Sequence, residues 1–214
     1  MSDHETVVRC LLQRAGRTFT EQAGFTLRDR PSPLWQLAVL SVVLAKPISA
    51  DLAVAAASEL RKAGGNTPNG MLALTWQQRV DACVRAHYRR FDESTATRME
   101  QAASYVNDHW KGDLRRLADQ AAGDIDRAGT LLQQIPGLGP AGADIFRREV
   151  QHIWLWIRPF LDERALAGAR ALGLPTRPAT LADLVPDNDL ARFAAALVRV
   201  KLDDDLAASL TRLH

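Results

Sequence analysis

The stretch Ile135-Pro-Gly-Leu-Gly-Pro-Ala-Gly-Ala-Asp144 is the most informative part of this 214-residue chain. It lies between two segments with helical periodicity, and its Gly137 and Gly139 can adopt backbone conformations that strain other residues. Pro140 stands at the start of the second helix, where a missing N–H has no consequence. The first N–H groups of a helix lack partners within it and lie at the positive end of its dipole. The stretch therefore predicts a hairpin between two helices that presents backbone amides to a phosphate.

The same stretch also has a purely structural interpretation. Two antiparallel helices can be joined by a short loop whose glycines serve only to make the connection tight. Phosphate contacts of the predicted kind would position a protein on DNA without reading its sequence. The stretch alone thus leaves both a nucleic-acid contact and a simple connection open.

The composition is that of an ordinary globular protein. Hydrophobic residues make up 47% and charged residues 24% of the chain, which is long enough to bury a core as one unit or two small lobes. The net charge is only +2, so bulk electrostatics does not demand a nucleic-acid partner. Of the 27 basic residues four are Lys, leaving 23 Arg, the residue that binds phosphate in a bidentate manner. A GC-rich genome would produce the same excess of Arg.

Cysteine usage and hydropathy exclude several classes of protein. Cys10 and Cys83 are the only cysteines, which excludes a disulfide framework and a four-cysteine metal or iron–sulfur site. The longest apolar run, residues 34–45, is too short to span a bilayer, and the acidic N-terminus lacks the pattern of a signal peptide. His87, His109 and His152 show no metal-ligand spacing among them. We therefore expect a cytoplasmic protein without a membrane segment or a metal site.

Helical patterns run through almost the whole chain. Residues 188–201 carry apolar side chains at a period of 3.6, and residues 34–45 are apolar nearly all round, which predicts a core helix. Ser49 and Thr75 stand where N-terminal caps are expected. Residues 154–159 are expected to form an extended connector. No segment alternates with period two, so the sequence predicts an all-α fold.

The segment from Leu131 to Ile145 resembles the helix–hairpin–helix motif of the endonuclease III-like DNA glycosylase superfamily. The pattern Pro-Gly-x-Gly-x-x-x-Ala is present at Pro136, Gly137, Gly139 and Ala143. Three further pieces follow the order of that family: a buried helix at 33–45, an aromatic and basic turn at 87–90 and a Gly-Asp-Leu helix start at 112–114. Together the resemblance covers about residues 30 to 170.

The resemblance implies a two-lobed helical glycosylase-like fold. Residues 32–150 would form a helical barrel lobe with the helix–hairpin–helix at about 125–152. Residues 1–31 and 151–214 would form the second lobe. Double-stranded DNA would lie across the cleft between the lobes, and we expect a monomer associated with the nucleoid.

The resemblance also assigns DNA contacts. The turn would supply Pro136, Gly137, Leu138, Gly139, Ala141 and Gly142, and it could hold a monovalent cation. Lys46 would fill the gap left by a flipped base, or else neutralise a helix C-terminus. Arg147 and Arg148 could reach phosphates or be solvated surface residues. Trp35 and Tyr88 could stack on an extruded base, with packing in the core as the alternative.

Asp162 matches the catalytic aspartate of the superfamily. A carboxylate near the sugar of a flipped nucleotide can stabilise an oxocarbenium-like transition state and orient water. The structural alternative is that Asp162 caps the helix that follows it, and the two roles are compatible. Bifunctional members carry a lysine where this chain has Ala141, or Gly142 if the register shifts by one. No Lys lies between Lys111 and Lys201, so Schiff-base lyase chemistry by that route is not expected.

These features favour a monofunctional DNA glycosylase that hydrolyses the N-glycosidic bond of a damaged or mismatched base. The main alternative is a non-catalytic helix–hairpin–helix protein that recognises damaged or branched duplex DNA. A third interpretation is a helical protein–protein module with a merely structural hairpin. No cofactor is expected, because the iron–sulfur cluster of the family needs cysteines that this chain lacks. The shape of the base pocket, which would select the lesion, is not encoded in any motif.

Overall fold

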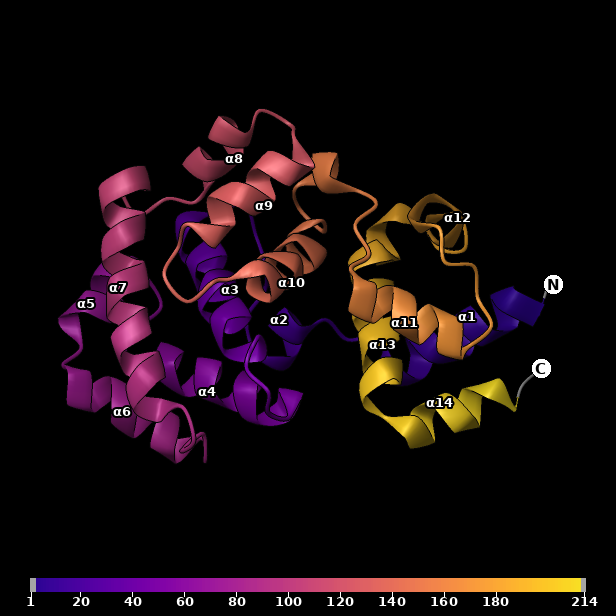
Figure 1. The fold of residues 1–214 in the computed structure, drawn as a ribbon, viewed down its shortest axis with the longest axis horizontal. Helices are drawn as coiled ribbons and strands as arrows, with labels where there is room; N and C mark the ends of the chain where they lie inside the picture. The colour runs from indigo at the N-terminus through magenta and orange to yellow at the C-terminus, as the bar shows by residue number, and fades with distance from the viewer. Residues whose placement is uncertain (1–2, 213–214) are drawn as a thin grey trace. The chain divides into compact units, whose positions relative to one another are not determined.

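The computed structural model describes residues 3–212 as helices and connecting turns, with no strand among them (Figure 1). The all-α prediction is confirmed. The chain divides into two compact units. The hairpin unit is Thr20–Phe146, and the terminal unit combines the described residues up to Phe19 with those from Arg147 onward.

The hairpin unit begins earlier than the lobe boundary expected at residue 32. The short helix α2 (Phe19–Gln22) leads into it. Ala23 and Phe25, which follow α2, line the same small cavity as Val39 and Ala57. Residues before 32 therefore pack with the helices that come after them.

The helices of the hairpin unit follow one another with short connections. They are α3 (Pro31–Leu44), α4 (Ala50–Lys62), α5 (Pro68–Ala73), α6 (Trp76–Arg85), α7 (Asp92–Trp110), α8 (Arg115–Ala121), α9 (Ile125–Gln133) and α10 (Pro140–Val150), the last of which crosses into the terminal unit. Between Leu34 and Leu44 every residue of α3 except Gln36 is buried, as its apolar sequence predicts.

The predicted caps fix where two helices begin. Ser49 Oγ accepts a hydrogen bond from the Leu52 N–H at 3.3 Å, at the start of α4. Thr75 and Gln78 form a reciprocal capping box at the start of α6, with distances of 3.1 and 2.8 Å. Both caps are confirmed.

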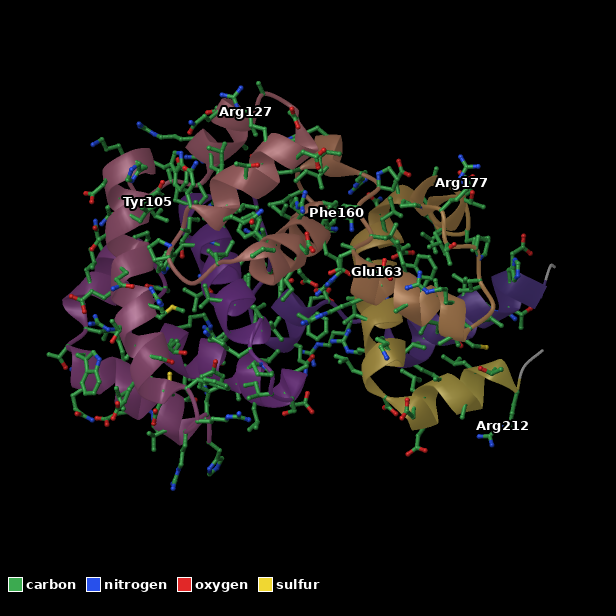
Figure 2. All side chains as sticks on the ribbon, viewed as in Figure 1. Tyr105, Arg127, Phe160, Glu163, Arg177 and Arg212 are labelled. Atoms are coloured by element: carbon green, nitrogen blue, oxygen red, sulfur yellow. The ribbon has the colours of Figure 1, made fainter. Side chains whose placement is uncertain are left out.

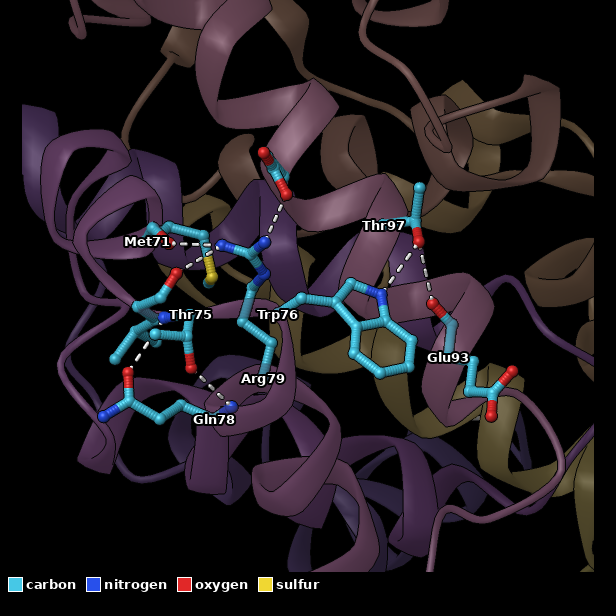
Figure 3. A network of polar contacts seen from close by, with 9 residues as sticks. Met71, Thr75, Trp76, Gln78, Arg79, Glu93 and Thr97 are labelled. Atoms are coloured by element: carbon cyan, nitrogen blue, oxygen red, sulfur yellow. Dashed lines mark hydrogen bonds and ion pairs between the residues drawn. The ribbon is translucent and has the colours of Figure 1, made fainter.

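Arg79 ties α5, α6 and α7 together (Figure 3). Its buried guanidinium donates to the carbonyls of Met71 (3.1 Å) and Leu74 (2.7 Å) and pairs with Glu100 of α7. The cation thus satisfies carbonyls at the C-terminal end of α5, which a helix leaves unpaired. One side of α7 is fixed against α6 by this network.

The terminal unit is built around α13. Its elements are α1 (Asp3–Ala15), the 3₁₀ turn η1 (Leu155–Ile157), α11 (Glu163–Ala171), α12 (Pro178–Ala182), the 3₁₀ turn η2 (Asp187–Asp189), α13 (Leu190–Leu202) and α14 (Asp204–Thr211). The connector expected to be extended at residues 154–159 contains η1 instead, and the rings of Trp154 and Trp156 stack beside it at 5.8 Å. No helix within residues 3–212 is long and apolar enough to cross a membrane.

Candidate nucleic-acid interface

The predicted hairpin is present between α9 and α10. The Leu138 N–H donates to the Ile135 carbonyl at 3.0 Å, and the Ala143 N–H donates to the Gly139 carbonyl at 2.9 Å. Gly137 has φ +88°, a left-handed conformation that favours glycine. The prediction is therefore confirmed at Gly137, whereas Gly139 does not adopt a positive φ.

Two glycines allow the turn to pack closely on α3 and α7. A methyl group on Gly137 would lie 3.3 Å from Val42 Cγ1 and 3.4 Å from Arg98 Cβ. A methyl group on Gly142 would lie 3.5 Å from the Ser41 carbonyl oxygen. The buried side of the turn is thus seated on the end of α3 and on α7.

The other side of the turn is open. Gly139, Pro140 and Ala141 are exposed, and no atom lies within 4 Å of the position that a Cβ of Gly139 would occupy. Within the described part of the chain, two exposed residues of this segment, Gly139 and Ala141, have N–H groups without a hydrogen-bond partner. Unpaired donors at the start of a helix form a site for an anion.

Basic side chains stand at the helix ends beside the turn. Lys46 directly follows Ala45, whose Cβ lies 3.9 Å from the Cβ position of Gly142. The Lys46 ammonium is 5.9 Å from the ring of Phe91, the residue before α7, and the Arg90 guanidinium is 5.2 Å from the same ring. The position of Lys46 follows from the sequence. The positions of Arg98 and Phe91 do not, because only the packing of α7 against the turn brings them here.

Asp162 belongs to the terminal unit and is buried. Its Oδ1 accepts from the Ala165 N–H at 2.9 Å, which confirms that it caps α11. Its other oxygen pairs with Arg148 of α10, and the two side chains are only 3% and 2% exposed. The expectation that Arg148 lies on the surface is corrected, because its guanidinium is buried as the partner of this carboxylate.

Further polar contacts surround this ion pair. The Gln151 side chain donates to the carbonyls of Arg148 and Phe160, each at 2.9 Å, and accepts from the Phe160 N–H at 3.0 Å. The Arg148 guanidinium lies 5.7 Å from the Phe19 ring, and the half-buried Arg147 lies 4.4 Å from the Phe160 ring. Both arginines expected to reach phosphates therefore pack on aromatic rings of the terminal unit.

Trp35 and Tyr88 are core residues. Trp35 is 1% exposed, and its Nε1 donates to the Gly65 carbonyl at 3.0 Å. Tyr88 is 2% exposed, and burial raises its pKa to about 12. Of the two interpretations given for these residues, packing in the core is the one that matches their positions.

The residues present do not fit an iron–sulfur cluster of the kind found in the superfamily. Such a cluster needs four cysteines, whereas Cys10 lies in the terminal unit and Cys83 is buried in the hairpin unit. Burial raises the pKa of the Cys83 thiol to about 12. Within residues 3–212, no three His, Cys, Asp or Glu side chains gather as metal ligands.

Comparison with known proteins shows the fold. The chain is similar to endonuclease III in a trapped covalent intermediate with DNA, an estranged-adenine complex, with a TM-score of 0.53 and 14% identity. It is also similar to endonuclease III in a non-covalent complex with DNA, with a TM-score of 0.52 and 16% identity. Each alignment covers 92% of this chain and 85% of the other. No family model and no curated protein matches the sequence. The chain thus has the all-α helix–hairpin–helix fold of endonuclease III.

Proposed function

We propose that this protein binds double-stranded DNA and acts in DNA repair, with the hairpin turn as a contact to the phosphate backbone. The exposed turn with its unpaired N–H groups carries the proposal. Lys46 and Arg98 stand beside it, so positive charge adds to the helix dipole there. Contacts of this kind fix a protein on a duplex without selecting a sequence.

The salt dependence of duplex binding tests this proposal. A labelled duplex is titrated with the protein at several salt concentrations, and the dissociation constant is measured by fluorescence anisotropy. The logarithm of the association constant should fall linearly with the logarithm of the salt concentration, with a slope of about −0.9 for each phosphate contacted. If no binding is measurable at low salt, the proposal fails and the hairpin is a structural connection.

A second candidate function is removal of a damaged or mismatched base by Asp162. The position of Asp162 at the N-terminus of α11 favours it, since this is where the resemblance puts the catalytic aspartate. The pairing with Arg148 opposes it, because a guanidinium offsets the negative charge that would stabilise an oxocarbenium ion. Catalysis by Asp162 would require that Arg148 release this oxygen.

An excision assay separates the two candidates. Duplexes that contain uracil, an alkylated purine or a mismatch are incubated with the protein, and abasic sites are revealed by alkali. A monofunctional glycosylase leaves the strand intact until alkali is added, because Ala141 supplies no lyase nucleophile. Asp162→Asn should abolish release of the base, since Asn still caps a helix but carries no charge. Full activity of this variant, or no release from any lesion, excludes the second candidate.

A further inference from the structure

Helix α7 runs along one side of the hairpin. Gly137 in the turn packs on Arg98, with 3.4 Å to the Arg98 Cβ from the Cβ position of the glycine. The Tyr105 hydroxyl donates to Gln134 Oε1 at 3.0 Å, just before the turn. These two contacts are about two helical turns apart on α7, so the hairpin and the helix lie side by side.

A row of polar side chains follows this side of α7. We call it the α7 stripe, and it consists of Ser94, Arg98, Gln101, Tyr105 and His109. At 100° per residue, these five positions fall within about 80° of one another around the helix. All are exposed except Tyr105, which is half-buried and is labelled in Figure 2.

Charge is unevenly distributed around α7. The stripe contains no carboxylate, and its cation Arg98 donates to Gln101 Oε1 at 3.0 Å. Asp92 and Glu93 fall elsewhere around the helix, and Glu100 pairs with Arg79 of α6. Asp108 alone borders the stripe, so this side of α7 suits an anionic partner better than the other sides do.

Three aromatic rings pack together at the far end of the stripe. The rings of Tyr105 and His109 stack at 3.8 Å with an interplanar angle of 14°, and Trp110 meets Tyr105 edge-on at 5.6 Å. His109 Nδ1 lies 3.0 Å from the Tyr105 carbonyl oxygen. Because a carbonyl can only accept, Nδ1 carries the hydrogen of this bond, and Nε2 donates to a phosphate oxygen in the imidazolium form, in which both ring nitrogens carry hydrogen.

We propose that the α7 stripe is a second part of the duplex contact, binding the sugar–phosphate backbone beside the phosphate held at the turn. This inference rests on the proposed function. The stripe is about 22 Å long, which spans roughly six base pairs of duplex. Arg98 and Gln101 bind the phosphates nearest the turn, and His109 binds further along the backbone.

Two variants that preserve the packing of the helix can be used to test the α7 stripe. Arg98→Gln retains the Cβ and Cγ that touch Gly137 and removes the charge, and His109→Phe retains a ring on Tyr105 and removes the nitrogens. Each should weaken duplex binding about three- to tenfold. Arg98→Gln should also reduce the magnitude of the salt slope by about 0.9, the value for one phosphate contact. Arg127→Ala, on α9 and apart from α7 (Figure 2), is the control that loses an exposed charge elsewhere.

The outcomes distinguish this inference from the proposed function. If duplex binding is weakened by changes at the turn but not by Arg98→Gln or His109→Phe, the contact ends at the turn and the inference is overturned. An Arg127→Ala variant that loses as much affinity as Arg98→Gln also overturns it, because any surface charge would then serve. If the wild-type protein binds no duplex, the proposed function itself has failed.

Discussion

The Asp162 carboxylate makes two buried interactions, so replacing this residue is expected to affect the stability of the protein. Its carboxylate caps α11 through the Ala165 N–H and pairs with Arg148, both away from water. A buried charge that loses its partner destabilises a protein strongly, whereas removal of both charges has a much smaller effect. The pair therefore contributes to stability mainly because each buried charge is neutralised by the other.

A double-mutant cycle tests this view of the pair. Arg148→Met leaves Asp162 buried without a countercharge and should lower the free energy of unfolding by about 3–5 kcal/mol. Adding Asp162→Asn should restore part of that loss, because Asn keeps the cap and leaves no buried charge. Urea denaturation of the four proteins gives the coupling energy. Strictly additive losses would mean that the two side chains do not interact.

Tyr88 provides a pH-dependent test of burial. Its pKa is raised to about 12 by burial, so the folded protein holds this proton more tightly than the unfolded chain does. Its contribution to stability is full below a pH of about 10, the ordinary tyrosine pKa, and is lost as pH rises towards 12. In Tyr105→Phe, Tyr88 is the only tyrosine. Its phenolate absorbance should titrate near 12 while circular dichroism still reports helix. A midpoint near 10 in the folded protein would mean an accessible ring and would restore the base-stacking role.

At the residue scale, the features that could be predicted from the sequence are those that depend on residues nearby in the chain. Asp162 stands before a helical pattern, which is enough to predict its cap. The burial of Arg148 could not be predicted, because arginine is rarely buried and its partner lies 14 residues away. Arg98 was missed for a similar reason, since its place beside the turn depends on how two helices pack.

At the scale of elements, one glycine sets how closely two helices of the terminal unit approach. A methyl group on Gly168 of α11 would lie 1.9 Å from the Leu197 carbonyl oxygen of α13. Gly168→Ala must therefore push the helices apart and should lower the free energy of unfolding by about 1–3 kcal/mol. Ala171→Ser, exposed on the same helix, should change it by less than about 0.5 kcal/mol. Equal stability of the two variants in urea denaturation would contradict this packing.

Helices that are apolar nearly all round or strongly amphipathic were predicted well, and a short helix with a polar start was not. The core helix α3 and the two helices of the hairpin follow from their sequences. Helix α14 was missed, because it starts with two aspartates after the N-cap residue Asp203 and buries only Leu210. It is held by the Asp203 side chain, which accepts from the Leu206 N–H at 2.9 Å, and by packing on α1 and α13. The Asp203 cap is a local signal that covers only the first turn of the helix. The packing on α1 and α13 cannot be predicted from a sequence pattern.

At the scale of the whole molecule, a net charge of +2 says little about partners. What favours DNA is the local arrangement in the hairpin unit, where backbone donors, Lys46 and Arg98 meet at one turn. The fold could be predicted because the hairpin motif and three other pieces occur in order. The reaction could not, since one fold supports many functions and the chemistry depends on individual side chains.

The central claim is that the open side of the hairpin turn binds a backbone phosphate, and a pair of substitutions at Gly139 tests it most directly. A Cβ at this position would meet no atom within 4 Å, and both Asp and Asn are good caps for α10. Gly139→Asp and Gly139→Asn should therefore melt at similar temperatures. They differ by one negative charge placed where the phosphate would lie.

The measurement is the dissociation constant of each variant for the same duplex at low salt. We predict that Gly139→Asp binds at least about tenfold more weakly than Gly139→Asn, because like charges repel at short range and a factor of ten corresponds to only about 1.4 kcal/mol. The difference should shrink as salt is added. Equal affinity of the two variants would contradict phosphate binding at this turn.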